Sequence, residues 1–242
     1  MNRRIFLRKA FAVSGAFYLP PRRRFKTKHL VFIVNGAARK KDYYEDASLS
    51  PNIRRLAQEA FVFAEDHCEH VASHEIAFSE LLPGPLLDCI GTGVQIRSIC
   101  RIPHTMQLHR PRLLICRESA HDVGHRSYEQ YLSSVRISDA AIGRVFDWIK
   151  GHPYFSKNTA IVIRPEFGRD DEVNQHGQLH HSYGFYYTHR VASIFWGPDF
   201  NQGVDRKTVI SSFDMTPTLA GLFNLNATYA QGQVVPGLFR RR

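Results

Sequence analysis

The stretch "HLVFIVNG", residues 29–36, decides the fold, because it is apolar without interruption and ends in glycine. A strand with one solvated face would alternate apolar and polar residues, whereas a strand buried on both faces is a continuous apolar run. Further apolar runs follow along the chain: "RLLIC" (112–116), "TAIVIR" (159–164) and "RVASIFWGP" (190–198). These four segments predict one sheet that helices cover on both faces.

The segments between these runs have helical spacing. "SPNIRRLAQEAFVF" (50–63) offers Ser50 as an N-cap and Pro51 as the first helical residue, and its apolar residues Ile53, Leu56, Ala57 and Ala60 recur at helical intervals. One apolar stripe runs along a long helix, Ser127–Lys150, and "SSFDMTPTLAGLFNL" (211–225) predicts a final helix. Pro83–Arg110 shows no clear element. Strands that alternate with helices of this length favour a three-layer αβα sandwich around a mostly parallel central sheet.

Length and composition are those of one globular domain. The chain has 242 residues, of which 43% are hydrophobic and 22% charged, so global disorder is excluded and residues 28–242 are expected to form a single α/β domain. The formal net charge of +10 is concentrated in the first 28 residues and in the terminal Arg240–Arg242. Because no basic motif is interleaved with aromatics, nucleic acid is not an expected partner.

The N-terminal residues 1–27 form a basic leader. "NRRIFLRKAF" places Arg3 and Arg4 ahead of a short, mildly apolar run, and Ser14-Gly15-Ala16 offers a cleavage site. The segment resembles a bacterial twin-arginine export signal, with Asn2 where Ser or Thr is usual. The apolar run is too short to span a bilayer. We expect an exported, periplasmic protein, with a plain basic leader as the alternative.

Ligand-type side chains follow the predicted strands, where ligands bind in sheets of this kind. The residues concerned are Asn35 after the first run, His121, Asp122 and His125 after the second, and Glu166, Asp170, His176, His180 and His181 after the third. Ser73 precedes a predicted helix, whose N-terminus favours an anion. Taken singly, each has a structural alternative, such as an N-cap, a surface histidine or a loop carboxylate. Their convergence at strand ends favours a site for zinc, manganese or iron.

The order of these motifs resembles the alkaline phosphatase superfamily, which includes the sulfatases, from about Lys28 to about Leu225. The segments that carry the resemblance are "SPNIRRLAQEAFVFAEDHC" (50–68), "SHEIAFSELLPG" (73–84), "HDVGH" (121–125), "TAIVIRPEFGRD" (159–170), "HHSYG" (180–184), "THRVASIFWGPDFNQG" (188–203) and "DMTPTLAGLFNL" (214–225). The resemblance implies the alkaline phosphatase and sulfatase fold, and a small anionic ester as the substrate.

The resemblance also implies roles for single residues. Ser73 stands where the family has its nucleophile. Asp122, His125 and His180 or His181 would hold one divalent metal, zinc in the first place and manganese or iron as alternatives. His121 and Asp122 both remain candidates, because the family spaces its Asp and His by four residues and Asp122 precedes His125 by three. The formylglycine of sulfatases is not expected, since "SHEIA" lacks the x-Pro-x-Arg that follows its precursor.

A second metal would need residues that this chain has changed. Asn35 stands in place of the family's first-strand Asp, and Glu166-Phe167-Gly168 in place of Asp-His-Gly. A phenyl ring binds no metal, so a site made of Asn35, Glu166 and Ser73 lacks one carboxylate and one imidazole. We therefore expect metal-dependent hydrolysis of a phosphate or sulfate ester at a reduced metal site. The alternative is a degenerate member that acts as a binding or structural module.

The export signal has a direct test. If Arg3 and Arg4 form a twin-arginine signal, replacing both by Lys should keep the protein in the cytoplasm, because the transporter reads the arginine pair. Cell fractionation and immunoblotting measure this. Normal periplasmic recovery of the double variant would show that the leader is an ordinary basic segment.

Overall fold

The computed structural model describes residues 24–81, 93–96, 98–227 and 230–240; residues 1–23 of the predicted leader 1–27 lie outside them. One seven-stranded sheet has the order β3-β4-β1-β5-β6-β2-β7. Its strands are β1 His29–Asn35, β2 Phe61–His67, β3 Gly93–Ile96, β4 Leu113–Glu118, β5 Thr159–Arg164, β6 Arg190–Trp196 and β7 Gly203–Ser211. β6 is antiparallel to both of its neighbours, and every other pair in the sheet is parallel. The four predicted strands thus lie in one mostly parallel sheet, as expected.

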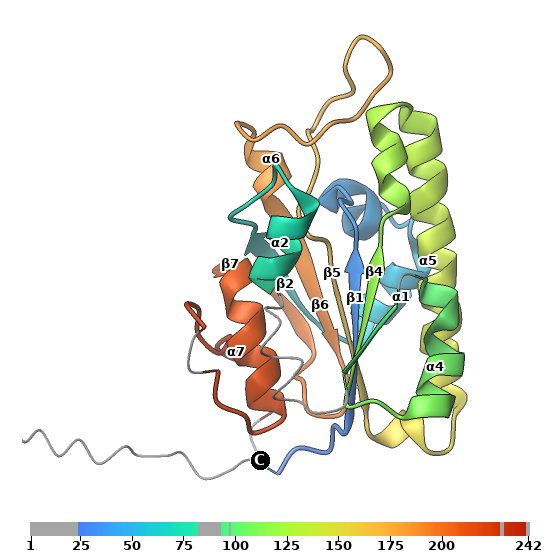
Figure 1. Ribbon diagram of the computed structural model, residues 1–242, viewed down its shortest axis with the longest axis vertical. Coiled ribbons are helices and arrows are strands. Elements are labelled where there is room, and N and C mark those ends of the chain that lie inside the picture. The colour runs from blue at the N-terminus through green and yellow to red at the C-terminus, as the bar shows by residue number, and fades with distance from the viewer. Residues whose placement is uncertain (1–23, 82–92, 97, 228–229, 241–242) are drawn as a thin grey trace, which may run out of the picture.

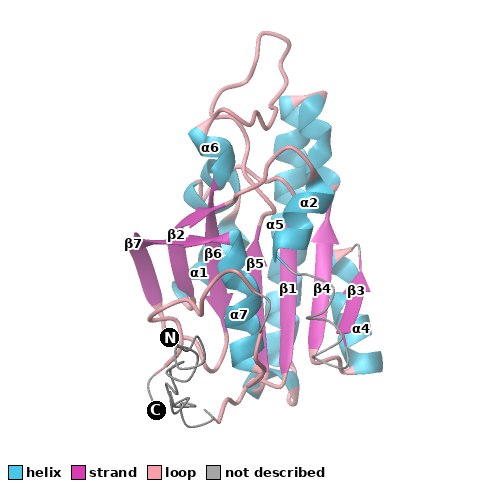
Figure 2. Cartoon of the chain, turned by 60° about the vertical axis from the view of Figure 1, so that its left-hand side comes forward, coloured by secondary structure: helices cyan, strands magenta, loops and turns pink. Residues whose placement is uncertain are grey.

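Helices cover both faces of the sheet (Figures 1 and 2). They are α1 Pro51–Gln58, α2 His74–Leu81, α4 Ile102–His109, α5 Tyr128–Gly151, α6 Tyr186–His189 and α7 Ser212–Leu222, with short helical turns at Lys41–Glu45, Ile99–Arg101, Ala120–His125 and Phe155–Lys157. Side chains of α1, α4 and α5 share one core with Val31 and Ile33 of β1. Side chains of α2 and α7 share the other with Leu30 and Phe32. Because neighbouring residues of β1 face opposite cores, the three-layer sandwich is confirmed.

Two local predictions were wrong. The helix expected over 50–63 ends at Gln58, and Phe61 begins β2, which lies between β6 and β7. Aromatic and β-branched residues favour a strand at this point, and pairing with two neighbours satisfies the backbone. Pro83–Arg110, where no clear element was expected, contains β3 and α4 in its described part. Among the described helices, none combines the length and the apolar character that crossing a bilayer requires.

Asp139 of α5 caps α1 from across the core. Its carboxylate, which is almost fully buried, accepts hydrogen bonds from the backbone N–H groups of Asn52 and Ile53 and from the Asn52 side chain, at 2.7–3.2 Å. The expected cap, Ser50, donates its hydroxyl to the Asp42 carbonyl instead. A carboxylate at a helix N-terminus satisfies N–H groups that have no partner within the helix. Asp139 thereby fixes α1 against α5.

This cap predicts a difference between two acidic residues of α5. Asp139→Ala should lower the free energy of unfolding by about 1–3 kcal/mol, because three donors lose their acceptor. Asp147→Ala removes only an exposed ion pair with Arg55 and should cost no more than about 0.5 kcal/mol. Urea unfolding curves of both variants measure these values. Equal losses would contradict the capping role.

Candidate metal centre

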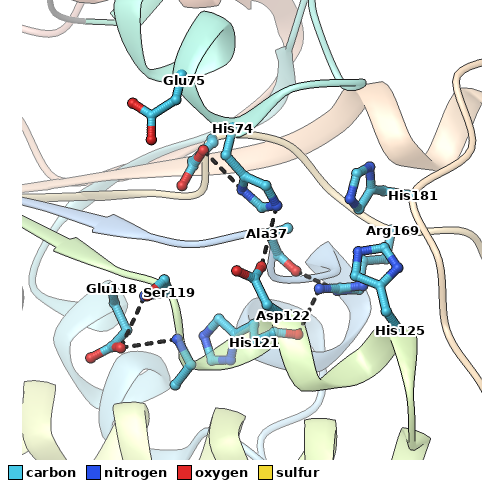
Figure 3. A network of polar contacts seen from close by, with 12 residues as sticks. Ala37, His74, Glu75, Glu118, Ser119, His121, Asp122, His125, Arg169 and His181 are labelled. Atoms are coloured by element: carbon cyan, nitrogen blue, oxygen red, sulfur yellow. Dashed lines mark hydrogen bonds and ion pairs between the residues drawn. The ribbon is translucent and has the colours of Figure 1, made fainter.

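The centre lies at the carboxyl ends of β1, β4 and β5, where Arg169 gathers three chain segments. The guanidinium is fully buried and donates to the backbone carbonyls of Ala37, His121 and Leu179 at 2.6–2.7 Å. Figure 3 shows the bonds to Ala37 and His121. Ala37 follows β1, His121 follows β4, and Leu179 belongs to the long connection after β5. Burial lowers the pKa of Arg169. Arg169 therefore fixes the mutual positions of the loops that carry the site.

Three histidines from separate segments meet at this point. His74 begins α2, His125 ends the turn after β4, and His181 lies in the connection after β5 (Figure 3). One ligand atom from each lies within 4.8 Å of the other two, and all three side chains are partly buried. Because zinc binds imidazole nitrogens at about 2.0–2.1 Å, small side-chain rotations suffice for a shared ion.

Hydrogen bonds fix which ring nitrogen of His181 and His74 is available. His181 Nδ1 lies 2.8 Å from the Val71 carbonyl, and His74 Nδ1 lies 3.1 Å from Glu166 Oε2. Both partners only accept, so each Nδ1 carries a proton and Nε2 is the nitrogen left for a metal. His74 Nε2 also lies 3.2 Å from Asp122 Oδ1, so His74 must release its second proton before it can bind one. Burial lowers the pKa of His181 to about 4, whereas the hydrogen bond that His74 donates to Glu166 raises the pKa of His74. His181 is thus neutral at pH 7, the form that binds metal.

His180 orients His125 in the same way. His125 Nδ1 lies 2.8 Å from His180 Nδ1, and His180 Nε2 lies 3.2 Å from Gln178 Oε1. If His180 donates from Nε2 to Gln178, its Nδ1 accepts from His125, which keeps the His125 Nε2 lone pair for a metal. Burial lowers the pKa of His125. The structure thus brings His181 to the centre and places His180 behind His125.

The two candidates at the start of this turn have different surroundings. His121 is fully buried, with Nδ1 2.8 Å from Ser134 Oγ and Nε2 3.2 Å from Asn35 Oδ1, and burial lowers its pKa to about 3. Both of its ring nitrogens are therefore used within the core. Asp122 is half-exposed, and its Oδ1 lies 3.2 Å from His74 Nε2. Geometry thus favours Asp122 as a ligand.

The residues predicted for a second metal do not form a metal-binding cluster in the described part of the chain. Glu166 is buried and uses both oxygens, Oε2 with His74 and Oε1 with Arg117 Nε at 3.4 Å. The oxygen of the Asn35 side chain faces His121. Phe167 is buried, and its ring packs against the rings of His74 and His181, with centroids 4.8 and 4.6 Å apart. Phe167 thus supports two imidazoles in a place where the family has a ligand.

A cavity of about 290 Å³ adjoins His74, one of the three histidines, and is lined by His74, Glu75, Arg117, Ser119, Asp122 and Glu166. Ser73, the candidate nucleophile, is not among the described residues that line it; its carbonyl accepts from the Ala77 N–H inside α2. Sequence reasoning missed His74 and Arg117. His74 stands beside Ser73, whose hydroxyl is the more obvious nucleophile, and nothing else in the sequence marks His74 as a ligand. Arg117 directly follows an apolar run, which is the pattern of a buried strand.

Two other candidates lie outside the centre. The Asp170 carboxylate accepts from the Ser182 N–H and hydroxyl at 2.6 Å and from the Thr188 hydroxyl at 3.0 Å, so it shapes the connection after β5. His176 is exposed in a turn of the same connection, where its N–H donates to Asn174.

No protein-family profile and no curated protein sequence matches the chain. Similar solved structures include a 2-O GAG sulfatase (TM-score 0.69, 11% identity, 86% of this chain and 73% of that one). A protein in the alkaline phosphatase superfamily from Vibrio parahaemolyticus has a TM-score of 0.60 and 12% identity over 85% of this chain and 68% of that one. Murine ectonucleotide pyrophosphatase/phosphodiesterase 5, solved with AMP, has a TM-score of 0.65 and 11% identity over 88% of this chain and 100% of that one. The chain therefore has the alkaline phosphatase and sulfatase fold that the order of its motifs predicted.

Proposed function

We propose that the protein hydrolyses phosphate or sulfate esters with one divalent metal, zinc in the first place, held by His74, His125 and His181. The observation that carries this proposal is the convergence of the three imidazoles within 4.8 Å at the carboxyl end of the parallel strands. The fold supports it, because structures of a GAG sulfatase and of a phosphodiesterase share that fold.

The donor set has the chemistry of a catalytic zinc site. Three imidazoles leave a coordination position open, and the carboxylate of Asp122 adjoins them. The outer partners of the rings are Glu166, the Val71 carbonyl and His180, and such partners orient metal-binding imidazoles and raise their basicity. A divalent ion held by these residues would polarise an ester oxygen and lower the pKa of a bound water.

The residues predicted to hold a second metal support a centre with one metal ion. Glu166, which would have to bind a second metal, is instead hydrogen-bonded to His74 and paired with Arg117, and Phe167 offers no ligand atom. One metal per chain follows from this proposal. The same features also favour the alternative of a binding or structural module, which predicts that added zinc brings no hydrolysis.

The proposed metal site predicts that some histidine substitutions weaken zinc binding and others do not. Wild-type protein should bind one zinc ion, and His125→Ala or His181→Ala should weaken zinc binding at least tenfold, because each removes a ligand. His176→Ala is the matched control, since this exposed residue lies in the same chain segment as His181 but away from the centre. Elemental analysis and chelator competition measure stoichiometry and affinity. Two ions per chain, or equal affinities of all variants, would contradict the proposed site.

The nucleophile can be tested with Ser73. Because Ser73 does not line the cavity, we expect direct attack by water, and Ser73→Ala should keep the zinc-dependent rate within about tenfold of wild type while retaining zinc. The readout is 4-nitrophenol release from aryl phosphate and aryl sulfate. A collapse of the rate with full zinc occupancy would establish Ser73 as the nucleophile that the family resemblance implies.

A further inference from the structure

We infer that Arg117 is the second cation of this site and restricts it to esters that carry a single negative charge, namely sulfate monoesters and phosphate diesters. The inference rests on the proposed function and names its substrate class. It starts from the wall of the cavity, where Arg117 is the one arginine or lysine among the described lining residues.

Arg117 is held rigidly in that wall. It lies near the carboxyl end of β4, paired with Val34 of β1. Its Nε donates to Glu166 at 3.4 Å, its Nη1 donates to Glu75 at 2.8 Å, and its guanidinium lies over the ring of Phe78 at 4.9 Å from the centroid. A guanidinium presents five N–H groups in a fixed planar fork. The bonds to Glu75 and Glu166 use one N–H of Nη1 and the N–H of Nε. The other three N–H groups, two of them on Nη2, are not bound by these carboxylates and can donate to an oxyanion in the cavity.

Glu166 couples this guanidinium to the metal centre. One of its oxygens binds Arg117 and the other binds His74, whose Nε2 is left for the metal. The guanidinium and the metal position are therefore fixed relative to each other through one buried carboxylate. An ester group bound in the cavity can place one oxygen at the metal and another at Arg117, and a charged donor strengthens such a hydrogen bond about twofold over a neutral one.

The charges of the lining decide which esters fit. Glu75, Asp122 and Glu166 supply three negative charges, which balance one divalent ion and one guanidinium when His74 is neutral. A dianionic phosphate monoester would bring a second negative charge into a cavity that has no net positive charge. A sulfate monoester or a phosphate diester brings only one and still offers two oxygens to the two cations. Repulsion between like charges at short range therefore selects against the dianion.

The experiment compares three aryl esters with the same leaving group at pH 8: 4-nitrophenyl sulfate, bis(4-nitrophenyl) phosphate and 4-nitrophenyl phosphate. With zinc-loaded wild type, kcat/KM for the better of the two monoanionic esters should be at least tenfold higher than kcat/KM for the dianionic 4-nitrophenyl phosphate. If the better substrate is the sulfate, the protein is a sulfatase; if it is the phosphate diester, the protein is a diesterase. Arg117→Met should lower kcat/KM for the preferred ester about 10–100-fold with zinc occupancy retained. Arg117→Lys, which keeps the charge, should recover part of the loss.

Two further variants keep the test independent of folding defects. Glu75→Gln changes an exposed side chain and removes one negative charge from the cavity. It should therefore reduce the ratio of kcat/KM for the preferred monoanionic ester to kcat/KM for the dianion. Arg110→Met, which alters the arginine at the C-cap of α4, three residues before β4 begins, should leave all three rates unchanged. Calorimetric titration with methyl sulfate, dimethyl phosphate and methyl phosphate gives the same comparison without turnover.

The outcomes separate the two proposals. If wild type hydrolyses none of the three esters with zinc bound, the proposed function fails and the inference fails with it. If wild type is active but prefers the dianion, or if Arg117→Met matches wild type in rate and in binding of the methyl esters, the inference is overturned while the proposed function stands.

Discussion

The site depends on one buried cation, Arg169, whose hydrogen bonds within the described residues all go to backbone carbonyls. Arg169 binds three backbone carbonyls from three segments, and these bonds replace the water that its guanidinium loses on burial. Carbonyl oxygens carry only partial charges, so burial still lowers the pKa of Arg169. In return, each of the three segments gains a hydrogen-bond donor for one of its backbone carbonyls. The spacing of His74, His125 and His181 depends on it, since two of these histidines lie on the clamped segments.

The two halves of the centre have opposite characters. On one side, three imidazoles keep Nε2 for a metal, and their outer nitrogens are held by groups that fix the tautomer. On the other side, a carboxylate that would serve a second ion is instead bound by side chains of the chain itself. Phe167 packs on two of the imidazoles. An aromatic ring in a ligand's place thus becomes part of the support for the remaining site.

Sequence reasoning found the central strands because each is a long apolar run, and it found α5 because its stripe is long. It missed β2 because Phe61 and Val62 continue a helical pattern, and it missed β7 because an edge strand with Arg206 and Lys207 has little apolar signal. The fold could therefore be predicted, but the edges of the sheet could not. In the site, His125 and the pair His180 and His181 followed from motifs, but the choice of His181 within that pair did not. The choice between His121 and Asp122 depends on which side chain turns into the core, and that is a tertiary property.

The reversed strand β6 gives the site its most adaptable part. β5 ends and β6 begins at the same end of the sheet, the one at which the parallel strands have their carboxyl ends. The whole connection 165–189 therefore stays at that end, where it supplies Glu166, Phe167, Arg169, His180 and His181. If β6 were parallel to β5, this chain segment would have to cross to the opposite end of the sheet. The connection is therefore a long excursion between two paired neighbours, and lengthening it adds only slowly to the entropy of loop closure. Insertions there would reshape the mouth of the cavity without altering the sheet, which makes this connection the natural place for related chains to diverge in selectivity.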